Sequence, residues 1–122
     1  MFSNSMYLIF EGPSESPQDI NITVYNSTSL NVTWNPPTIL HQNGIITKYK
    51  LIYSTTGSEV SNTGTREVDG SRHSVLLVGL EKNTEYNITM SAATSAGFGP
   101  YSNAVLAVTD EDGNIVENTI SF

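Results

Sequence analysis

Alternation of apolar and polar residues over short segments is the feature that most restricts what this chain can fold into. Apolar side chains recur at every second position within 20–24, 30–34, 49–53, 75–77 and 86–92. In an extended strand this period directs one face toward a core and the other toward solvent. The strong helix formers never recur with a 3.6-residue period. The pattern therefore predicts an all-β protein of short antiparallel strands.

Turn-forming residues separate these segments. They occur as Asn26-Ser27, Asn35-Pro36-Pro37, Asn43-Gly44, Asp69-Gly70 and Gly97 to Pro100. Proline ends a strand because it has no N–H for a central ladder, and glycine after Asn or Asp favours a tight turn. Seven strands at this spacing over about 95 residues are typical of a β-sandwich. A chain of 122 residues is long enough for one such domain.

The charge and the cysteine content exclude several kinds of function. The formal net charge is −7 and the five basic residues do not cluster, so the chain has no basic face for nucleic acid or an anionic membrane. There are no cysteines, which excludes disulfides, thiol catalysis and cysteine-based zinc sites. No apolar run approaches the roughly 20 residues that span a bilayer. We expect no nucleic-acid partner, no membrane insertion and no cofactor.

Four motifs in the expected order resemble a fibronectin type III domain, and the resemblance covers residues 13–110. A lead-in with proline and two strands occupies 17–34, and 43–53 (NGIITKYKLIY) resembles the family's third strand. The stretch 80–86 (LEKNTEY) precedes a strand, and 96–102 (AGFGPYS) resembles the turn between the last two strands. The resemblance implies a seven-stranded antiparallel immunoglobulin-like β-sandwich.

Five large residues are expected to form the structural core rather than a binding site. Trp34 is the only tryptophan, and its indole brings a large apolar area to an inward position. Tyr86 lies six residues after Leu80. This spacing resembles a tyrosine corner, in which the hydroxyl bonds the backbone a few residues upstream. Tyr49 and Leu51 complete the set on the inward face of their strand.

The two ends of the chain lie outside the resemblance to this domain. Residues 1–12 resemble the last strand of a preceding module, because FSNS at 2–5 is similar to YSNA at 101–104 and an apolar run follows both. A leader left by cloning is the alternative. An unpaired apolar strand promotes association, so residues 1–11 are expected to pair with a sheet edge, in the same molecule or in a neighbouring one. Residues 111–122 are predicted to be an acidic linker or tail.

The polar residues do not form a recognisable catalytic or metal site. His41 and His73 lack further ligands at a recognisable spacing, and we interpret them as solvated loop residues. The run DEDGN at 110–114 is similar to a calcium loop, but Ile115 and Ser121 stand where that loop requires glycine and an acid. The motifs of serine hydrolases, phosphate loops and zinc proteases do not occur. We predict that the chain is not an enzyme.

Four N-glycosylation sequons begin at Asn21, Asn26, Asn31 and Asn87. Their number is close to chance for a chain this rich in Asn, Ser and Thr. Their placement is more informative, because all four fall on outward strand positions or in a turn, where a glycan does not disturb a core. The sequons therefore favour a secreted or cell-surface protein.

Apolar side chains outside the core form a candidate contact surface. It consists of Ile52, Phe98, Tyr101, Leu106 and Val108. On the family's strand phasing, the two aliphatic residues of the last strand and Ile52 face outward on one sheet. We expect these three to join into one patch for homophilic or interdomain contact.

The resemblance implies a non-catalytic extracellular module of a multidomain receptor or cell-adhesion protein. Its expected partners are neighbouring fibronectin type III modules and other proteins. Such modules occur in receptor tyrosine phosphatases, receptor kinases and neural adhesion molecules. Two alternatives stay open. A ligand-binding module would use the loops 35–45 (B–C), 69–72 and 95–101 (F–G), and an accessory module would accompany the catalytic domain of a secreted enzyme.

Overall fold

The computed structural model describes residues 12–57 and 62–111, which form a sandwich of two antiparallel β-sheets. This architecture confirms the predicted all-β fold. The described residues contain eight strands and one short 3₁₀ helix: β1 (Gln18–Asn26), β2 (Ser29–Asn35), η1 (Ile39–His41), β3 (Lys48–Thr55), β4 (Thr63–Asp69), β5 (Ser74–Leu77), β6 (Glu85–Thr94), β7 (Gly97–Phe98) and β8 (Val105–Val108).

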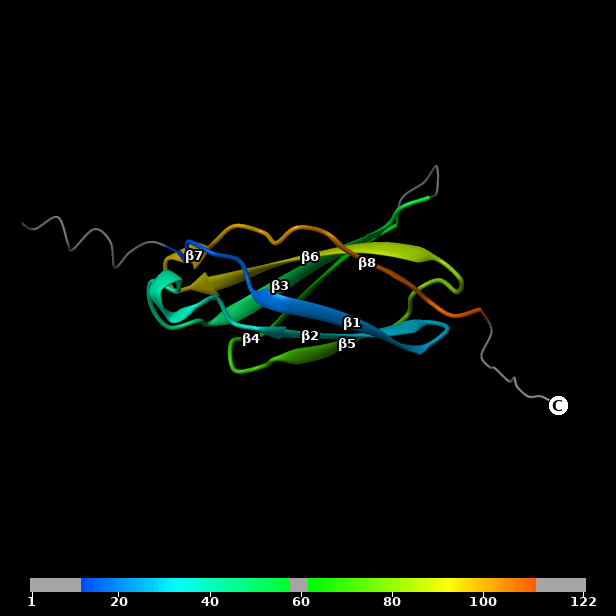
Figure 1. The fold of residues 1–122 in the computed structure, drawn as a ribbon, viewed down its shortest axis with the longest axis horizontal. Helices are drawn as coiled ribbons and strands as arrows, with labels where there is room; N and C mark the ends of the chain where they lie inside the picture. Colours follow the sequence, from blue (N-terminus) through cyan, green and yellow to red (C-terminus); the bar gives the residue numbers. More distant parts are fainter. Residues whose placement is uncertain (1–11, 58–61, 112–122) are drawn as a thin grey trace, which may run out of the picture.

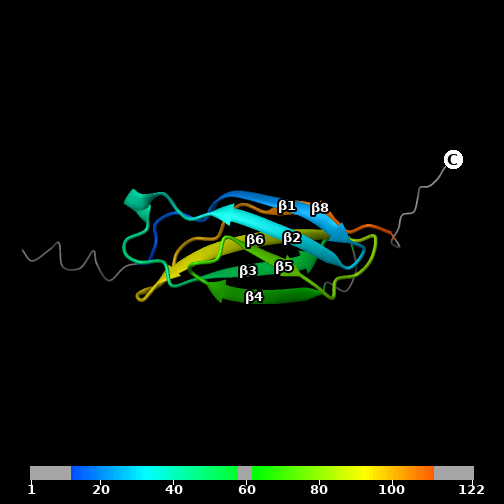
Figure 2. The same ribbon diagram turned by 90° about the horizontal axis from the view of Figure 1, so that it is seen from below.

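The strands form two layers (Figures 1 and 2). One sheet has the order β1-β2-β5, and the other has the order β4-β3-β6-β7, with β8 also paired to β6. The strand count is roughly the seven that the sequence predicts. The five alternating segments fall within β1, β2, β3, β5 and β6, whereas the sequence marked no segment for β4. Strand β7 is only a two-residue pairing of Gly97 and Phe98 with the end of β6.

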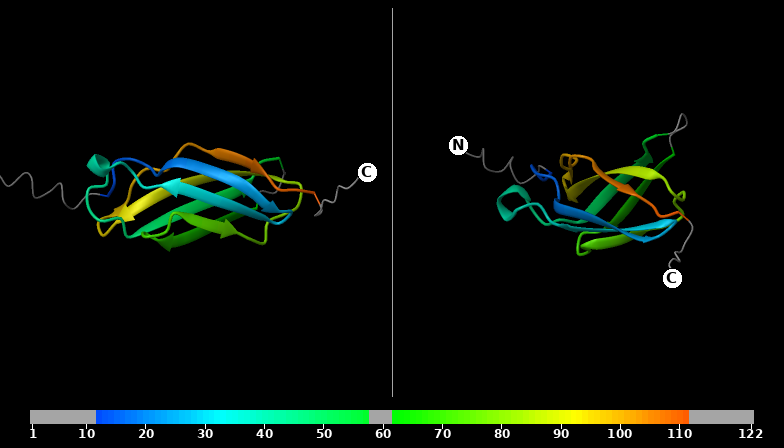
Figure 3. Two further views of the ribbon diagram at one scale, coloured as in Figure 1. Left: turned by 60° about the horizontal axis from the view of Figure 1, so that its bottom comes forward. Right: turned by 45° about the vertical axis from the view of Figure 1, so that its right-hand side comes forward.

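The chain runs from one end of the sandwich to the other. Residues 12–17 lie at the end that also carries β7 and η1, whereas residues 109–111 leave from the opposite end (Figures 1 and 3). We call the first end the N-terminal pole, and it comprises residues 12–17, 36–47 and 94–101. The two ends of the described chain are therefore far apart along the long axis.

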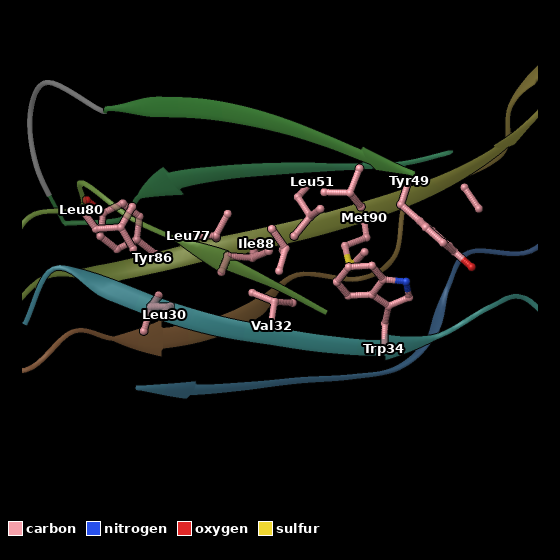
Figure 4. Close-up of a cluster of buried hydrophobic side chains, with 13 residues drawn as sticks. Leu30, Val32, Trp34, Tyr49, Leu51, Leu77, Leu80, Tyr86, Ile88 and Met90 are labelled. Carbon is pink, nitrogen blue, oxygen red and sulfur yellow. The ribbon is translucent and has the colours of Figure 1, made fainter. Parts of the chain in front are cut away.

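The core lies between the two sheets and is built from the inward faces of β2, β3, β5 and β6 (Figure 4). In β2, Leu30, Val32 and Trp34 are buried, and the residues between them are only half-buried. Trp34 contacts Tyr49 of β3 edge to face, with ring centroids 5.3 Å apart, an arrangement that aromatic rings favour. The period-2 pattern of the sequence thus becomes one continuous apolar layer.

A hydrogen bond between Tyr86 and the preceding loop closes the end opposite the N-terminal pole. The Tyr86 hydroxyl accepts the backbone N–H of Glu81 at 2.8 Å, which is the contact expected of a tyrosine corner. Leu80 is buried beside it, and its own N–H donates to the carbonyl of Thr28 at 2.9 Å. These contacts fix the loop before β6 against the turn between β1 and β2.

Three segments, 1–11, 58–61 and 112–122, lie outside the described residues. The predicted strand within residues 1–12 and its pairing with a sheet edge fall almost entirely on the first of them. The acidic linker or tail at 111–122 falls on the last, apart from Glu111. All of these stay predictions.

Candidate functional site

The N-terminal pole is the candidate site, because there the first described residues, which we call the strap (Gly12–Pro17), are fixed against the loop between β2 and β3. The Ser14 N–H donates to the carbonyl of His41 at 2.9 Å. The Ser14 hydroxyl lies 3.0 Å from Nδ1 of the same histidine. The Asn43 side-chain amide donates to the carbonyl of Gly12 at 2.9 Å. The strap therefore follows the β2–β3 loop and does not leave the domain freely.

A carboxylate adds a second anchor to the strap. Oε1 of Glu15 accepts both the N–H and the hydroxyl of Thr38, each at 2.8 Å. These hydrogen bonds, first from the Thr38 backbone and then from its side chain, lower the pKa of Glu15 below its ordinary value, because they favour the charged form. Thr38 immediately precedes η1, so this contact also fixes the start of that helix.

Glycine makes the close packing of the strap against the F–G turn possible. A Cβ on Gly12 would lie 2.8 Å from the carbonyl oxygen of Gly97, and a Cβ on Gly99 would meet the carbonyl oxygen of Pro13. Both contacts involve backbone atoms, which cannot move aside as a flexible side chain can. The AGFGPYS motif thus supplies a surface on which the strap lies.

Three aliphatic side chains of the β2–β3 loop are almost fully exposed at this pole. Ile39 is 81% exposed, Leu40 is 86% exposed and Ile45 is 83% exposed. They are the most exposed large hydrophobic residues of the described chain. The sequence analysis did not identify them as contact residues. The sequence carries no signal that separates them from other aliphatic residues of the loop, because Ile46 in the same loop packs against the core.

A cavity of about 280 Å³ opens beside Ile45, between the two loops of the pole. It is lined by Asn43, Gly44, Ile45, Thr47, Thr94 and Ser95. Asn43 adopts a positive φ of 56° and Gly44 a φ of 136°, conformations that Asn and Gly tolerate better than other residues. This backbone turn presents the side chain of Ile45 to solvent at the rim of the cavity.

Phe98 and Tyr101 of the F–G turn, two of the predicted contact residues, are also accessible here, at 39% and 42% exposure. The ammonium groups of Lys48 and Lys50 lie 5.6 and 5.7 Å from the centroid of the Phe98 ring, within the range of cation–π attraction. The loops 35–45 and 95–101, which the ligand-binding alternative would use, thus meet at one pole.

The other predicted contact residues lie away from the pole and are separated by strand β6. Ile52 of β3 is paired with Thr89 of β6, whereas Leu106 of β8 is paired with Asn87. The outward side chains of Asn87 and Thr89 therefore stand between Ile52 and Leu106. Leu106 and Val108 are exposed and share one face of β8. The structure thus places the three aliphatic residues in two separate groups.

The four sequon asparagines all lie on the surface of the sandwich. Asn21 and Asn26 are exposed, and Asn31 and Asn87 are half-buried. Asn21 and Asn31 face outward on neighbouring strands, where each stands opposite the threonine of the other's sequon. In the β1–β2 turn, the side-chain oxygen of Asn26 accepts the N–H of Thr28 at 3.0 Å.

The histidines and carboxylates do not converge on a metal site in the part of the chain that the structure describes. Residues 12–57 and 62–111 contain no group of three or more His, Asp or Glu side chains that could hold a metal ion. His41 is hydrogen-bonded to the strap, whereas the backbone carbonyl of His73 accepts the N–H of Trp34 at 3.0 Å. No helix among these residues is long and apolar enough to span a bilayer.

Comparisons with known proteins agree with the geometry of the sandwich. The fibronectin type III domain family matches residues 15–108. The chain is 43% identical over 103 residues to bovine (Bos taurus) receptor-type tyrosine-protein phosphatase F, covering 82% of this chain and 5% of that protein. It is 39% identical over 99 residues to rat (Rattus norvegicus) neogenin, covering 81% of this chain and 7% of that protein. It therefore spans only a small part of the length of these relatives.

A solved structure extends the likeness to three dimensions. The crystal structure of the FN5 domain of Drosophila Lar superposes with a TM-score of 0.65 at 30% identity, and the match covers 80% of this chain and 97% of that chain. The family match covers well over half of the chain, and the described residues form the antiparallel sandwich and the tyrosine corner that the resemblance implied. The chain belongs to the fibronectin type III domain family, whose members are non-catalytic modules.

Proposed function

We propose that this chain is an extracellular module of a multidomain receptor or cell-adhesion protein, where it spaces and orients its neighbours and contacts other proteins. The observation that carries the proposal is the position of the two ends of the described chain at opposite poles of the sandwich (Figure 3). A module connected in this way places its neighbours in line. The likeness to a receptor-type phosphatase supports a place in a receptor.

In this proposal the outer sheet face carries the glycans, and the N-terminal pole orients the neighbouring module. The outer faces of β1 and β2 carry Asn21 and Asn31, and glycans there would keep that side free of partners. The pole fixes the strap through hydrogen bonds that involve Thr38, His41 and Asn43. A neighbour that joins the chain through the strap would therefore be held in a defined direction.

An exchange of modules in the full-length protein tests this proposal. The coding sequence on both sides of the fragment is determined first, and a stop codon or a secreted catalytic domain in place of further modules would favour the accessory-module alternative. In the receptor, the module is then replaced by an unrelated fibronectin type III module of the same length. Retained cell adhesion with the replacement, but lost adhesion after deletion, is the result expected of a spacer.

The ligand-binding module is the second candidate, and the exposed loops at the N-terminal pole favour it. Loops 35–45 and 95–101 meet there and present Leu40, Phe98 and Tyr101 to solvent. A graft of these two loops onto the replacement module separates the two candidates. If the replacement abolishes binding of the receptor to its ligand and the loop graft restores it, the module binds that ligand directly and the spacer role is insufficient.

A further inference from the structure

Strand β6 carries one of the four sequons in the gap between the two groups of outward aliphatic side chains. Asn87, the first residue of this sequon, is half-buried on the outward face of β6, whereas the next residue, Ile88, is fully buried in the core. Directly opposite Asn87 stand Leu106 of β8 on one side and Ser54 of β3 on the other. A sugar on Asn87 would therefore start between β3 and β8.

Three outward aliphatic side chains surround this position. Leu106 is directly opposite Asn87, and the Cβ atoms of residues opposite each other in an antiparallel pair are about 5 Å apart. Val108 on β8 and Ile52 on β3 are its diagonal neighbours, at about 7–8 Å. Among the described strands, β8 pairs with β6 alone. Exposed aliphatic side chains on such an outer strand promote association unless something covers them.

The sequon of Asn21 provides the contrast. Asn21 is exposed on the outward face of β1 and stands opposite Thr33 of β2. Its diagonal neighbour on β2 is the polar Asn31, and β1 is the outermost strand of its sheet. A sugar on Asn21 would therefore meet polar side chains and solvent.

An N-glycan has the chemistry to cover the aliphatic side chains next to Asn87. Its first sugar, N-acetylglucosamine, is bonded directly to the asparagine side chain, so it stays at this surface with a high effective concentration. One face of the sugar ring presents C–H groups, and the N-acetyl group ends in a methyl. Both can remove aliphatic surface from water while the sugar hydroxyls remain solvated. The bulk of the glycan also keeps a protein partner away from the same surface.

We propose that a glycan on Asn87 is a structural part of the domain, with its first sugar packed on Leu106 and lying between Ile52 and Val108. The chain's own glycan then covers the aliphatic residues that were expected to contact another molecule, and this face of the sheet is closed to partners. The inference rests on the proposed extracellular location, because N-glycans are added in the secretory pathway.

Thermal unfolding of the glycosylated chain tests the contact. The chain is secreted from a eukaryotic cell that makes high-mannose glycans, an endoglycosidase trims each glycan to its first sugar, and peptide mass mapping measures the occupancy of Asn87. Asn87→Gln is expected to lower the Tm by at least about 2 °C, because aliphatic surface returns to water. The matched control, Asn21→Gln, removes a sugar from polar surroundings and should change the Tm by less than about 1 °C. In protein from bacteria, which carries no glycans, the two substitutions should have equal effects.

Replacement of the residue under the sugar gives a second readout. If the sugar packs on Leu106, the effect of Asn87→Gln on the Tm should fall by at least half in the Leu106→Ser background, because contacting groups are not additive. Nuclear Overhauser contacts between the N-acetyl methyl of this sugar and the Leu106 methyl groups are also expected.

Three results would each overturn the inference: an unoccupied Asn87, equal Tm changes for Asn87→Gln and Asn21→Gln in the glycosylated chain, or an undiminished effect of Asn87→Gln in the Leu106→Ser background. None of them contradicts the proposed spacer role, which the exchange of modules tests separately.

Discussion

Replacement of two buried tyrosines by phenylalanine should lower stability to very different extents, although each removes one hydroxyl. The Tyr86 hydroxyl accepts the Glu81 N–H at 2.8 Å in a side chain that is 3% exposed. The Tyr49 hydroxyl is fully buried and has no hydrogen-bond partner among the described residues. Burial raises the pKa of Tyr49, and the nearby Trp34 side chain opposes this shift with a smaller effect.

The magnitude of each change follows from these contacts. Tyr86→Phe removes a hydrogen bond with a net value of about 1 kcal/mol and leaves the partly buried Glu81 N–H without its acceptor, which costs about 1 kcal/mol or more. We expect the free energy of unfolding to fall by about 2 kcal/mol. Tyr49→Phe removes a hydroxyl that gains no hydrogen bond among the described residues, so the free energy of unfolding should fall by no more than about 0.5 kcal/mol.

Urea unfolding followed by Trp34 fluorescence measures both values, because that residue is the only tryptophan and is buried between the sheets. Thermal unfolding provides a check, with the Tm of a domain of this size falling by roughly 4–8 °C for each kcal/mol. Equal losses for Tyr86→Phe and Tyr49→Phe would refute the reasoning, since they would show that the hydroxyls have equivalent environments.

Three further predictions concern the strap and the surface. Gly99→Ala places a Cβ against the Pro13 carbonyl and should lower the free energy of unfolding, measured in urea, by about 1–3 kcal/mol. The control is Gly57→Ala, whose Cβ would meet nothing within 4 Å, and it should change that free energy by less than about 1 kcal/mol. Because the pKa of Glu15 is lowered, its contact with Thr38 should be complete above the ordinary carboxyl pKa and lost as pH falls through the lowered value. The chemical shift of the Thr38 amide should follow this titration, and Glu15→Gln should abolish the pH dependence of the shift. Secretion from a eukaryotic cell should add N-glycans at the sequons. If treatment of the secreted protein with an N-glycosidase left its mass unchanged, the prediction of glycosylation would be contradicted.

The sequence was sufficient to predict the two sheets and the core, because both depend on a local period. Burial alternates with period 2 in β5, through most of β2 and in the first half of β6, as a strand with one face against the opposite sheet requires. Trp34 was identifiable from its inward phase, whereas Tyr86 was identifiable from the spacing after Leu80 that resembles a tyrosine corner. The hydrogen bond of Tyr86 to Glu81 joins residues only five positions apart.

The N-terminal pole was not predictable in the same way, because its contacts join residues far apart in the chain. Ser14 and His41 are 27 positions apart, and Gly12 and Asn43 are 31 apart. Loop residues such as Leu40 follow no period, so their exposure becomes visible only when the path of the loop is known. Several such contacts, and not one motif, hold the strap.

The expected single patch of Ile52 with the residues of β8 illustrates another limit of the sequence. Outward phase was inferred correctly for Leu106 and Val108, which are 56% and 48% exposed. The patch was expected to cross the strand between them, which is β6, but the β6 residues paired with Ile52 and Leu106 are the polar Thr89 and Asn87. Phase along a strand is a local property, whereas the neighbour across the sheet is a property of the whole topology.

The amide of Ser14 provides the most direct test of the claim that the domain fixes the chain at its N-terminal pole. Its N–H donates to the His41 carbonyl at 2.9 Å, so its backbone order parameter should match that of β2, at about 0.85, and its exchange with solvent should be slowed. An order parameter below about 0.6, with exchange as fast as in an unstructured peptide, would show that the strap is free. That result would contradict the defined orientation of a neighbour that joins the chain through the strap.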